Sequence, residues 1–146
     1  METILEEPNI KIQKSELYNF LSICLEGDID FSAFKFAYEH MLDFAVRENV
    51  HRLILDHTKL GKSSLRTKSW FAAVMIPKIF AKLGFRLQVA IMVPPTKYID
   101  SKTKILISQF KNISKNVKIA PFEHLEEAYD WFSNIKIAEK TESSEQ

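Results

Sequence analysis

Apolar residues along the chain fall into short runs separated by longer stretches with helical spacing. The short runs predict five strands: residues 10–14, 17–26, 50–56, 85–93 and 117–120. The helical spacing predicts four helices: residues 31–48, 64–83, 99–113 and 121–132. Residues 14–16 suit a hairpin connection between the first two strands, whereas the later strands alternate with helices. The sequence therefore predicts an α/β domain.

Residues that favour helix ends support these boundaries. Asp30 precedes the first helix, and Ser63 or Ser64 precedes the second, where a side-chain oxygen can accept free backbone N–H groups. Gly84 suits the left-handed residue that closes the second helix, and Pro77 inside that helix should kink or shorten it. Pro121 is expected to open the last helix.

The element order, β-β-α-β-α-β-α-β-α, predicts one domain over residues 10–135. Buried strands that alternate with helices form a mostly parallel sheet with right-handed crossovers, and the opening hairpin adds an antiparallel edge. Residues 1–9 are interpreted as a lead-in. Residues 136–146 are polar and acidic, which predicts a disordered tail.

Composition excludes several classes of protein. The longest apolar run, residues 89–93, is too short to span a bilayer, and the acidic start of the chain does not resemble a signal peptide. The single cysteine, Cys24, excludes an internal disulfide. The three glycines are isolated, which excludes a glycine-rich phosphate loop. We therefore expect a cytoplasmic protein without an integral membrane segment.

Charge is divided unevenly along the chain. The net charge of the whole chain is +1, yet residues 1–56 carry eleven acidic and five basic residues. Residues 57–122 carry thirteen basic residues and one acid, Asp100, and residues 123–146 carry seven acids and two bases. Such a division reports on partners or self-association rather than on the fold.

Candidate chemistry concentrates in the polar stretch after the third predicted strand. Asp56 could pair with Lys59, bind a ligand, accept a phosphoryl group, or brace the loop through its N–H groups. His57 beside Asp56 suggests acid–base chemistry, since a free imidazole titrates near neutral pH, but neighbouring residues of an extended chain point to opposite faces, so the two do not form a dyad. The histidines lack metal-ligand spacing, and neither a cofactor nor a metal is expected.

Several short motifs occur in order along the chain: Glu26-Gly27, the segment from Asp56 to Gly61, Trp70 with Pro77, Val93-Pro94, and the segment from Leu125 to Trp131. In these motifs the chain resembles, over residues 10–132, small bacterial proteins of the STAS-like type, the fold of anti-sigma-factor antagonists. The resemblance implies a non-enzymatic regulatory or protein-interaction module. It also implies a serine at the start of the second helix that is phosphorylated in antagonists. Here Lys62 replaces the usual acid, so we expect neither Ser63 nor Ser64 to be phosphorylated stoichiometrically.

The second helix supplies the remaining candidates. At about 100° per residue, Lys68, Lys78 and Lys82 share a sector with Phe71 and Met75. Either the lysine stems shield the two apolar side chains, or the sector is an apolar interaction surface with a basic rim. Nucleic acid is not expected, because the basic residues lack interleaved aromatic residues.

We therefore predict that the chain binds an unidentified protein partner, and the charge division also allows a weak homodimer. The rivals are an enzyme built on Asp56 and His57, and a domain that binds a lipid, nucleotide or metabolite at the strand ends. The predicted binding residues are Asp56, Thr58, Lys59, Ser63, Ser64, Phe71, Met75, Pro94 and Thr96.

Overall fold

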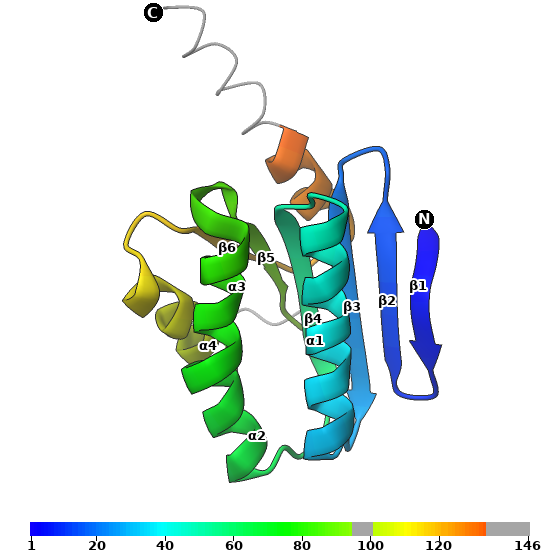
Figure 1. Ribbon diagram of the computed structural model, residues 1–146, viewed down its shortest axis with the longest axis vertical. Coiled ribbons are helices and arrows are strands. Elements are labelled where there is room, and N and C mark those ends of the chain that lie inside the picture. Colours follow the sequence, from blue (N-terminus) through cyan, green and yellow to red (C-terminus); the bar gives the residue numbers. More distant parts are fainter. Residues whose placement is uncertain (95–100, 134–146) are drawn as a thin grey trace, which may run out of the picture.

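A computed structural model describes residues 1–94 and 101–133 of the chain. They form a six-stranded sheet whose strands follow one another in chain order, β1 to β6 (Figure 1). The strands are β1 (Glu2–Glu7), β2 (Ile10–Ser15), β3 (Phe20–Gly27), β4 (Arg52–Leu60), β5 (Gln88–Met92) and β6 (Lys118–Phe122). The first three pair antiparallel and the last four parallel. The predicted mostly parallel sheet with an antiparallel N-terminal hairpin is confirmed.

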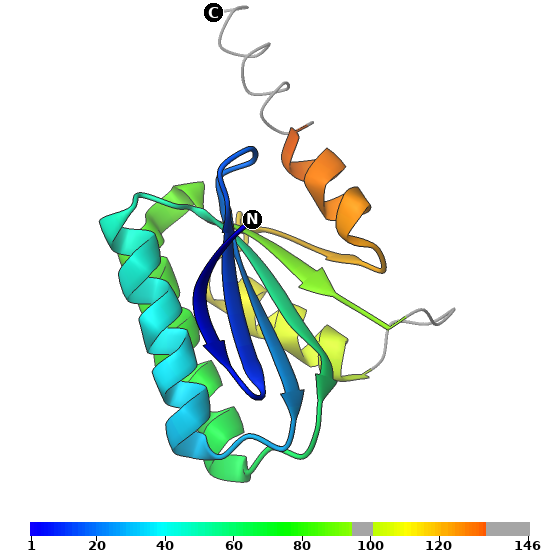
Figure 2. The same cartoon turned by 90° about the vertical axis from the view of Figure 1, so that its right-hand side faces the viewer.

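The helices cover the two faces of the sheet unequally. One face carries α1 (Phe31–Arg47), α2 (Leu65–Trp70), α3 (Ile76–Leu83) and α4 (Ser101–Ile113). The opposite face carries the helix of residues 125–133, which lies over part of the sheet (Figure 2). The main core fills the space under the first group of helices, and a smaller cluster built on Phe20, Ile54 and Phe132 lies under the last helix.

The ends of α1 follow from its sequence. Asp30 has extended backbone angles, and its carboxylate accepts the N–H of Ala33 at 2.8 Å, as an N-cap does. Buried residues then recur at helical spacing and face the sheet: Phe34, Ala37, Tyr38, Met41, Leu42 and Ala45. The predicted helix and its cap are confirmed.

The second helical segment is continuous but contains one wide turn. A π-helical turn, η1 (Phe71–Met75), joins α2 to α3, and Pro77 lies in the first turn of α3. Since proline has no N–H, a turn with altered hydrogen bonding accommodates it. Gly84 closes the segment with φ of +70°, a conformation that glycine adopts at little cost, and begins the 3-10 turn η2 (Gly84–Arg86).

Several boundaries differ from the sequence prediction. The turn of the hairpin lies at residues 16–19 rather than 14–16, and β5 begins at Gln88 rather than at residue 85. The expected lead-in forms the edge strand β1, which pairs with β2. The expected polar loop after Asp56 is strand, because β4 continues to Leu60 and pairs there with Gly27 of β3. Pro121 does not open the last helix; it lies in β6, which is an edge strand and so tolerates a residue without an N–H. The predicted tail, 136–146, lies outside the described residues.

Candidate functional site

The carboxyl ends of the parallel strands bring four predicted residues together. Asp56, Thr58, Lys59 and Pro94 line one hollow of about 470 Å³. The rest of its wall comes from the ends of β5 and β6 and from the start of the last helix: Met92, Val93, Glu123, His124, Leu125 and Glu126. Thr96, which was predicted at the carboxyl ends of the strands with Asp56, Thr58 and Pro94, lies outside the described residues.

Asp56 is held by its neighbours in the strand. Its Oδ1 accepts the backbone N–H of Thr58 at 3.0 Å and the Thr58 hydroxyl at 2.6 Å. Its Oδ2 lies 3.8 Å from the Cys24 thiol, which is positioned to donate. Burial, followed by the charge of Asp56, raises the pKa of Cys24 to about 11, so the thiol stays protonated at neutral pH. Both carboxylate oxygens therefore have partners within the protein, as expected of a bracing residue.

His57 faces the main core on the other side of β4. Its Nε2 is 2.5 Å from the hydroxyl of Tyr38, and its ring contacts those of Phe34 and Phe71. Burial lowers the pKa of His57 to about 4, despite the opposing charge of Asp56, and burial raises the pKa of Tyr38 well above its usual value. Both side chains are therefore neutral at neutral pH. As the alternation of side chains predicts, Asp56 and His57 do not meet.

Phe71 and Met75 are buried and do not form an exposed surface. Phe71 is 5% exposed and packs against Tyr38 at a ring-centroid distance of 4.8 Å, and Met75 is fully buried. The π-helical turn explains the difference from the sequence prediction, because a wider turn rotates the residues after it relative to those before it.

The connection from β4 to α2 is fixed at several points. The N–H of Gly61 donates to the carbonyl of Gly27 at 2.8 Å, and the N–H of Lys62 donates to the carboxylate of Asp28 at 2.8 Å. A Cβ at Gly61 would overlap Asp28 Oδ1, so the close approach requires glycine. At the end of the loop, the Ser64 hydroxyl accepts the N–H of Thr67 at 3.1 Å. The expected cap on this helix is confirmed.

Leu65 is exposed directly after this fixed loop. It is the first residue of α2 and 79% exposed. Beside it, the guanidinium of Arg66 lies 4.0 Å from the ring centre of Phe31, the first residue of α1. We call Phe31, Lys62, Ser63, Leu65 and Arg66 the Leu65 surface. Of the predicted site residues, only Ser63 belongs to it.

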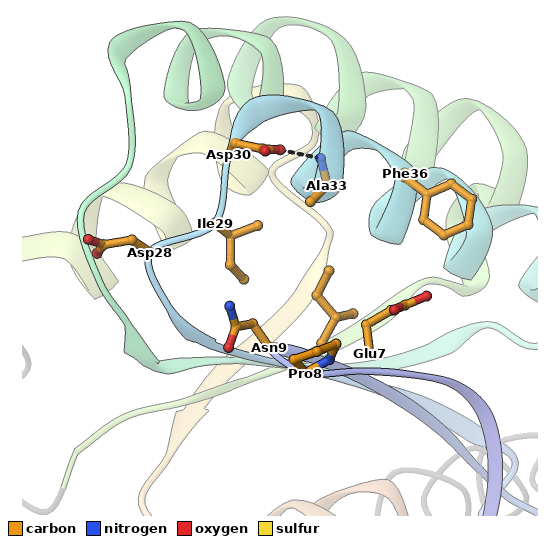
Figure 3. A pocket seen from close by; sticks show the side chains of 9 residues that line it. Glu7, Pro8, Asn9, Asp28, Ile29, Asp30, Ala33 and Phe36 are labelled. Atoms are coloured by element: carbon orange, nitrogen blue, oxygen red, sulfur yellow. Dashed lines mark hydrogen bonds between the residues drawn. The ribbon is translucent and has the colours of Figure 1, made fainter.

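A second hollow adjoins the loop through Asp28. It measures about 390 Å³ and lies between the β1–β2 turn and the start of α1 (Figure 3). Ile29, Ala33 and the half-exposed Phe36 supply apolar wall, and Glu7, Asp28 and Asp30 supply carboxylates. Asp28 and Asp30 accept backbone N–H groups, so part of this acidic lining serves the local fold.

The described residues contain neither a group of three or more potential metal-ligating side chains nor a helix long and apolar enough to cross a membrane. Lys59, predicted as a binding residue, is exposed and pairs with Glu26 at 3.4 Å. Such exposed pairs contribute little stability. The arrangement therefore offers surfaces and shallow hollows rather than a reactive cluster.

Comparison with solved structures identifies the architecture. The anti-sigma factor antagonist SpoIIAA in its unphosphorylated form superposes with a TM-score of 0.54 at 14% identity, covering 83% of this chain and 94% of that one. The chain has a SpoIIAA-like fold. An uncharacterized protein of the DUF3478 family with a SpoIIAA-like fold, from Shewanella loihica PV-4, superposes with a TM-score of 0.57 at 19% identity, covering 90% and 98% of the two chains. No family model matches the sequence, and neither does any curated protein.

Sequence reasoning missed the residues that complete each surface. The residues after β6 that line the hollow at Asp56 are far from Asp56 in the sequence, and only the pairing of the strands brings them together. The exposure of Leu65 could have been predicted from the sequence. Residues three or four apart share one face of a helix, and Leu65 is six residues from Phe71, so it does not lie on the apolar face. The contact between Phe31 and Arg66 carries no sequence signal, because it depends on how α1 and α2 are packed.

Proposed function

We propose that the chain is a non-enzymatic, cytoplasmic regulatory module that binds a protein partner through the Leu65 surface. The observation that carries the proposal is a large apolar side chain, 79% exposed, displayed at the end of a loop whose backbone is fixed at Gly61, Lys62 and Ser64. The SpoIIAA-like fold supports it, since the solved structure that this chain resembles is named as an anti-sigma factor antagonist.

The loop before Leu65 is ordered before any partner binds. Binding costs free energy whenever a loop must be ordered, and a loop that is already fixed avoids most of that cost. Exposed apolar residues are common singly and need no explanation alone. Leu65 differs because the guanidinium–ring contact of Arg66 and Phe31 also fixes its surroundings. An apolar side chain among ordered polar neighbours has the composition of an interface centre.

The non-enzymatic part of the proposal is supported by the placement of the candidate catalytic groups. His57 is buried against Tyr38, whereas Asp56 lies on the opposite face of the sheet and is bonded to Thr58. A general base needs a path to substrate, and a nucleophile needs a base within hydrogen-bond reach. The two residues offered by the sequence do not form such a pair.

Site-specific photo-crosslinking in the native cell tests the proposal. A photoreactive residue replaces Leu65 in one variant and Leu17 in a matched control. Leu17 is 81% exposed, but it lies in the β2–β3 turn at the opposite end of the sheet (Figure 1). We expect a discrete protein adduct at position 65 and none of the same mass at position 17. The same crosslinked adducts at both positions would contradict the proposal that the partner binds through the Leu65 surface.

One observation favours a second candidate, a small-ligand domain. The hollow of about 470 Å³ gathers Asp56, Thr58, Lys59 and Pro94 at the carboxyl ends of the strands, where open α/β sheets commonly bind ligands. A thermal-shift screen against nucleotides, lipids and metabolites tests it, because a ligand that binds the native state raises the melting temperature. A hit that Asp56→Asn abolishes would favour this function over the first.

A further inference from the structure

Exposed basic side chains follow α2, α3 and α4 on the side of the protein away from the sheet. We call six of them the basic helix face: Arg66, Lys68, Lys82, Lys102, Lys104 and Lys111. None of the six makes an ion pair within the described residues; the one pair on these helices joins Lys78 to Glu39 of α1 at 3.9 Å. From His57 to Phe122 the sequence has a single acid, Asp100, which lies outside the described residues.

Two of the helices that carry this face, α3 and α4, are neighbours. Phe80 of α3 and Phe110 of α4 pack with ring centroids 6.0 Å apart. One to two turns before these rings, Val74 is 47% exposed and Ile105 is 57% exposed. The face therefore combines unpaired positive charge with apolar side chains, and Arg66 connects it to the Leu65 surface.

From this arrangement we infer that the partner contributes an acidic, partly apolar protein segment that docks along the basic helix face beside Leu65. The inference rests on the proposed function and adds the chemistry of the partner. Opposite charges across an interface speed encounter and select among partners. The opposite face of the sheet strengthens that selection, because the last helix there exposes Glu126, Glu127 and Asp130. An acidic segment placed over that helix would be repelled.

Two other kinds of occupant fit less well. Single-stranded nucleic acid binds where successive bases stack on several exposed rings. No aromatic residue of α2, α3 or α4 is exposed among the described residues, and the exposed Phe85 of η2 is a single ring. A helix that lies on a membrane inserts an apolar face into the lipid. Here the apolar faces of α3 and α4 are buried in the core through Ile79 and Phe110.

Selection from a displayed library of random twelve-residue peptides tests the inference with the full chain as bait. We expect the selected peptides to be enriched in Asp and Glu by at least about twofold over the input library. The affinity of a chosen peptide should fall at least about tenfold in the variant Lys104→Glu/Lys111→Glu. It should change less than about twofold in the charge-matched control Lys11→Glu/Lys35→Glu, whose exposed lysines lie on β2 and α1.

The remaining outcomes each contradict the inference. Peptides that require Leu65 but are not enriched in acids would overturn the acidic partner and leave the proposed function standing. Binding to phosphatidylserine vesicles or to a DNA oligonucleotide, without selected peptides, would replace the protein segment with a lipid or a nucleic acid. A dimer in sedimentation at low salt that becomes a monomer in Lys104→Glu/Lys111→Glu would make a second copy the occupant. Failure to select any peptide would also overturn it, whereas crosslinking at position 65 tests the proposed function separately.

Discussion

The two faces of β4 differ in what covers them. On one face, Leu53, Leu55 and His57 are packed beneath the helices α1 to α4. On the other face, Ile54 is covered by the helix of residues 125–133, and beyond that cover Asp56 and Thr58 line an open hollow. On the first face of β4, therefore, the side chains are buried along the strand. On the second face they are buried at Ile54 and become exposed to the hollow toward the carboxyl end of the strand.

This difference shows why residue type alone does not tell which side chains are available for binding. His57 is polar, yet it lies on the covered face and has become part of an aromatic cluster. Leu65 is apolar, yet no other element packs over it among the described residues, and it is exposed. Whether a side chain is available for binding depends on the elements that pack over it, and those elements come from distant parts of the sequence.

The largest effect expected from this comparison is on the covered side. Phe71→Ala should lower the free energy of unfolding by about 3–5 kcal/mol, because it removes a ring packed against Phe34, Tyr38 and His57. Leu65→Ala should change it by less than about 0.5 kcal/mol, since that side chain is exposed. Urea denaturation of both variants measures the contrast. Similar losses for the two would mean that Leu65 is part of the fold.

His57 should make the protein sensitive to mild acid. Its folded pKa of about 4 lies below the ordinary value of 6.5, so the unfolded chain binds the proton more tightly. The contribution of His57 to the free energy of unfolding is therefore complete above pH 6.5 and is lost as pH falls through about 4. Between pH 7 and pH 5 the free energy of unfolding should decrease by about 2 kcal/mol.

The variant His57→Gln removes this titration and can retain the hydrogen bond with Tyr38. Its free energy of unfolding should therefore fall less over the same pH interval than that of the wild type. His124→Gln, at an exposed histidine, is the control and should follow the wild type. Parallel curves for His57→Gln and the wild type would refute the buried neutral histidine.

A smaller effect is expected on the open face. Asp56→Asn should cost on the order of 1–2 kcal/mol with the fold retained, because the carboxylate accepts two hydrogen bonds from Thr58. Glu26→Gln, which removes an exposed carboxylate paired with Lys59, should cost less than about 1 kcal/mol. If Asp56→Asn were neutral or stabilising, the carboxylate would be retained for binding rather than for structure.

The smallest stability effect is expected at the loop before α2. Ser64→Ala removes the cap on the N–H of Thr67 and should cost about 1 kcal/mol, whereas Ser63→Ala removes no hydrogen bond seen in the structure and should be near neutral. Intact-mass measurement of protein from the native cell should show no stoichiometric phosphate on either serine. A mostly phosphorylated population mapped to Ser63 or Ser64 would restore an antagonist-type mechanism.

Most of the fold was predictable because its strands and helices bury apolar residues that recur at regular spacing in the sequence. The parts that were missed have local reasons. β1 is an edge strand whose ends are exposed acids, so little burial marks it in the sequence. The polar residues that end β4 resemble a loop, and pairing with β3 makes them strand. Pro121 resembles a helix start, and the sheet edge accepts it.

The candidate site was less predictable, for two physical reasons. The π-helical turn changes the rotation between Phe71 and the lysines that follow, so a regular helical wheel put the buried Phe71 in one sector with lysines and left its burial undecided. The hollow at Asp56 needs β5, β6 and the last helix to be in place, and no local pattern specifies their order. What the sequence did predict, Asp56, Thr58 and Pro94 together at the carboxyl ends of the strands, follows from strands that run parallel.

The most direct test of the account compares two exposed leucines at opposite ends of the sheet. Calorimetry would measure the affinity of the crosslinked partner, once it is purified, for the wild type, Leu65→Ala and Leu17→Ala. The account predicts that Leu65→Ala weakens binding by at least about tenfold, as for an interface anchor, while Leu17→Ala leaves it unchanged. Equal affinities for Leu65→Ala and the wild type would contradict the claim that the Leu65 surface binds the partner.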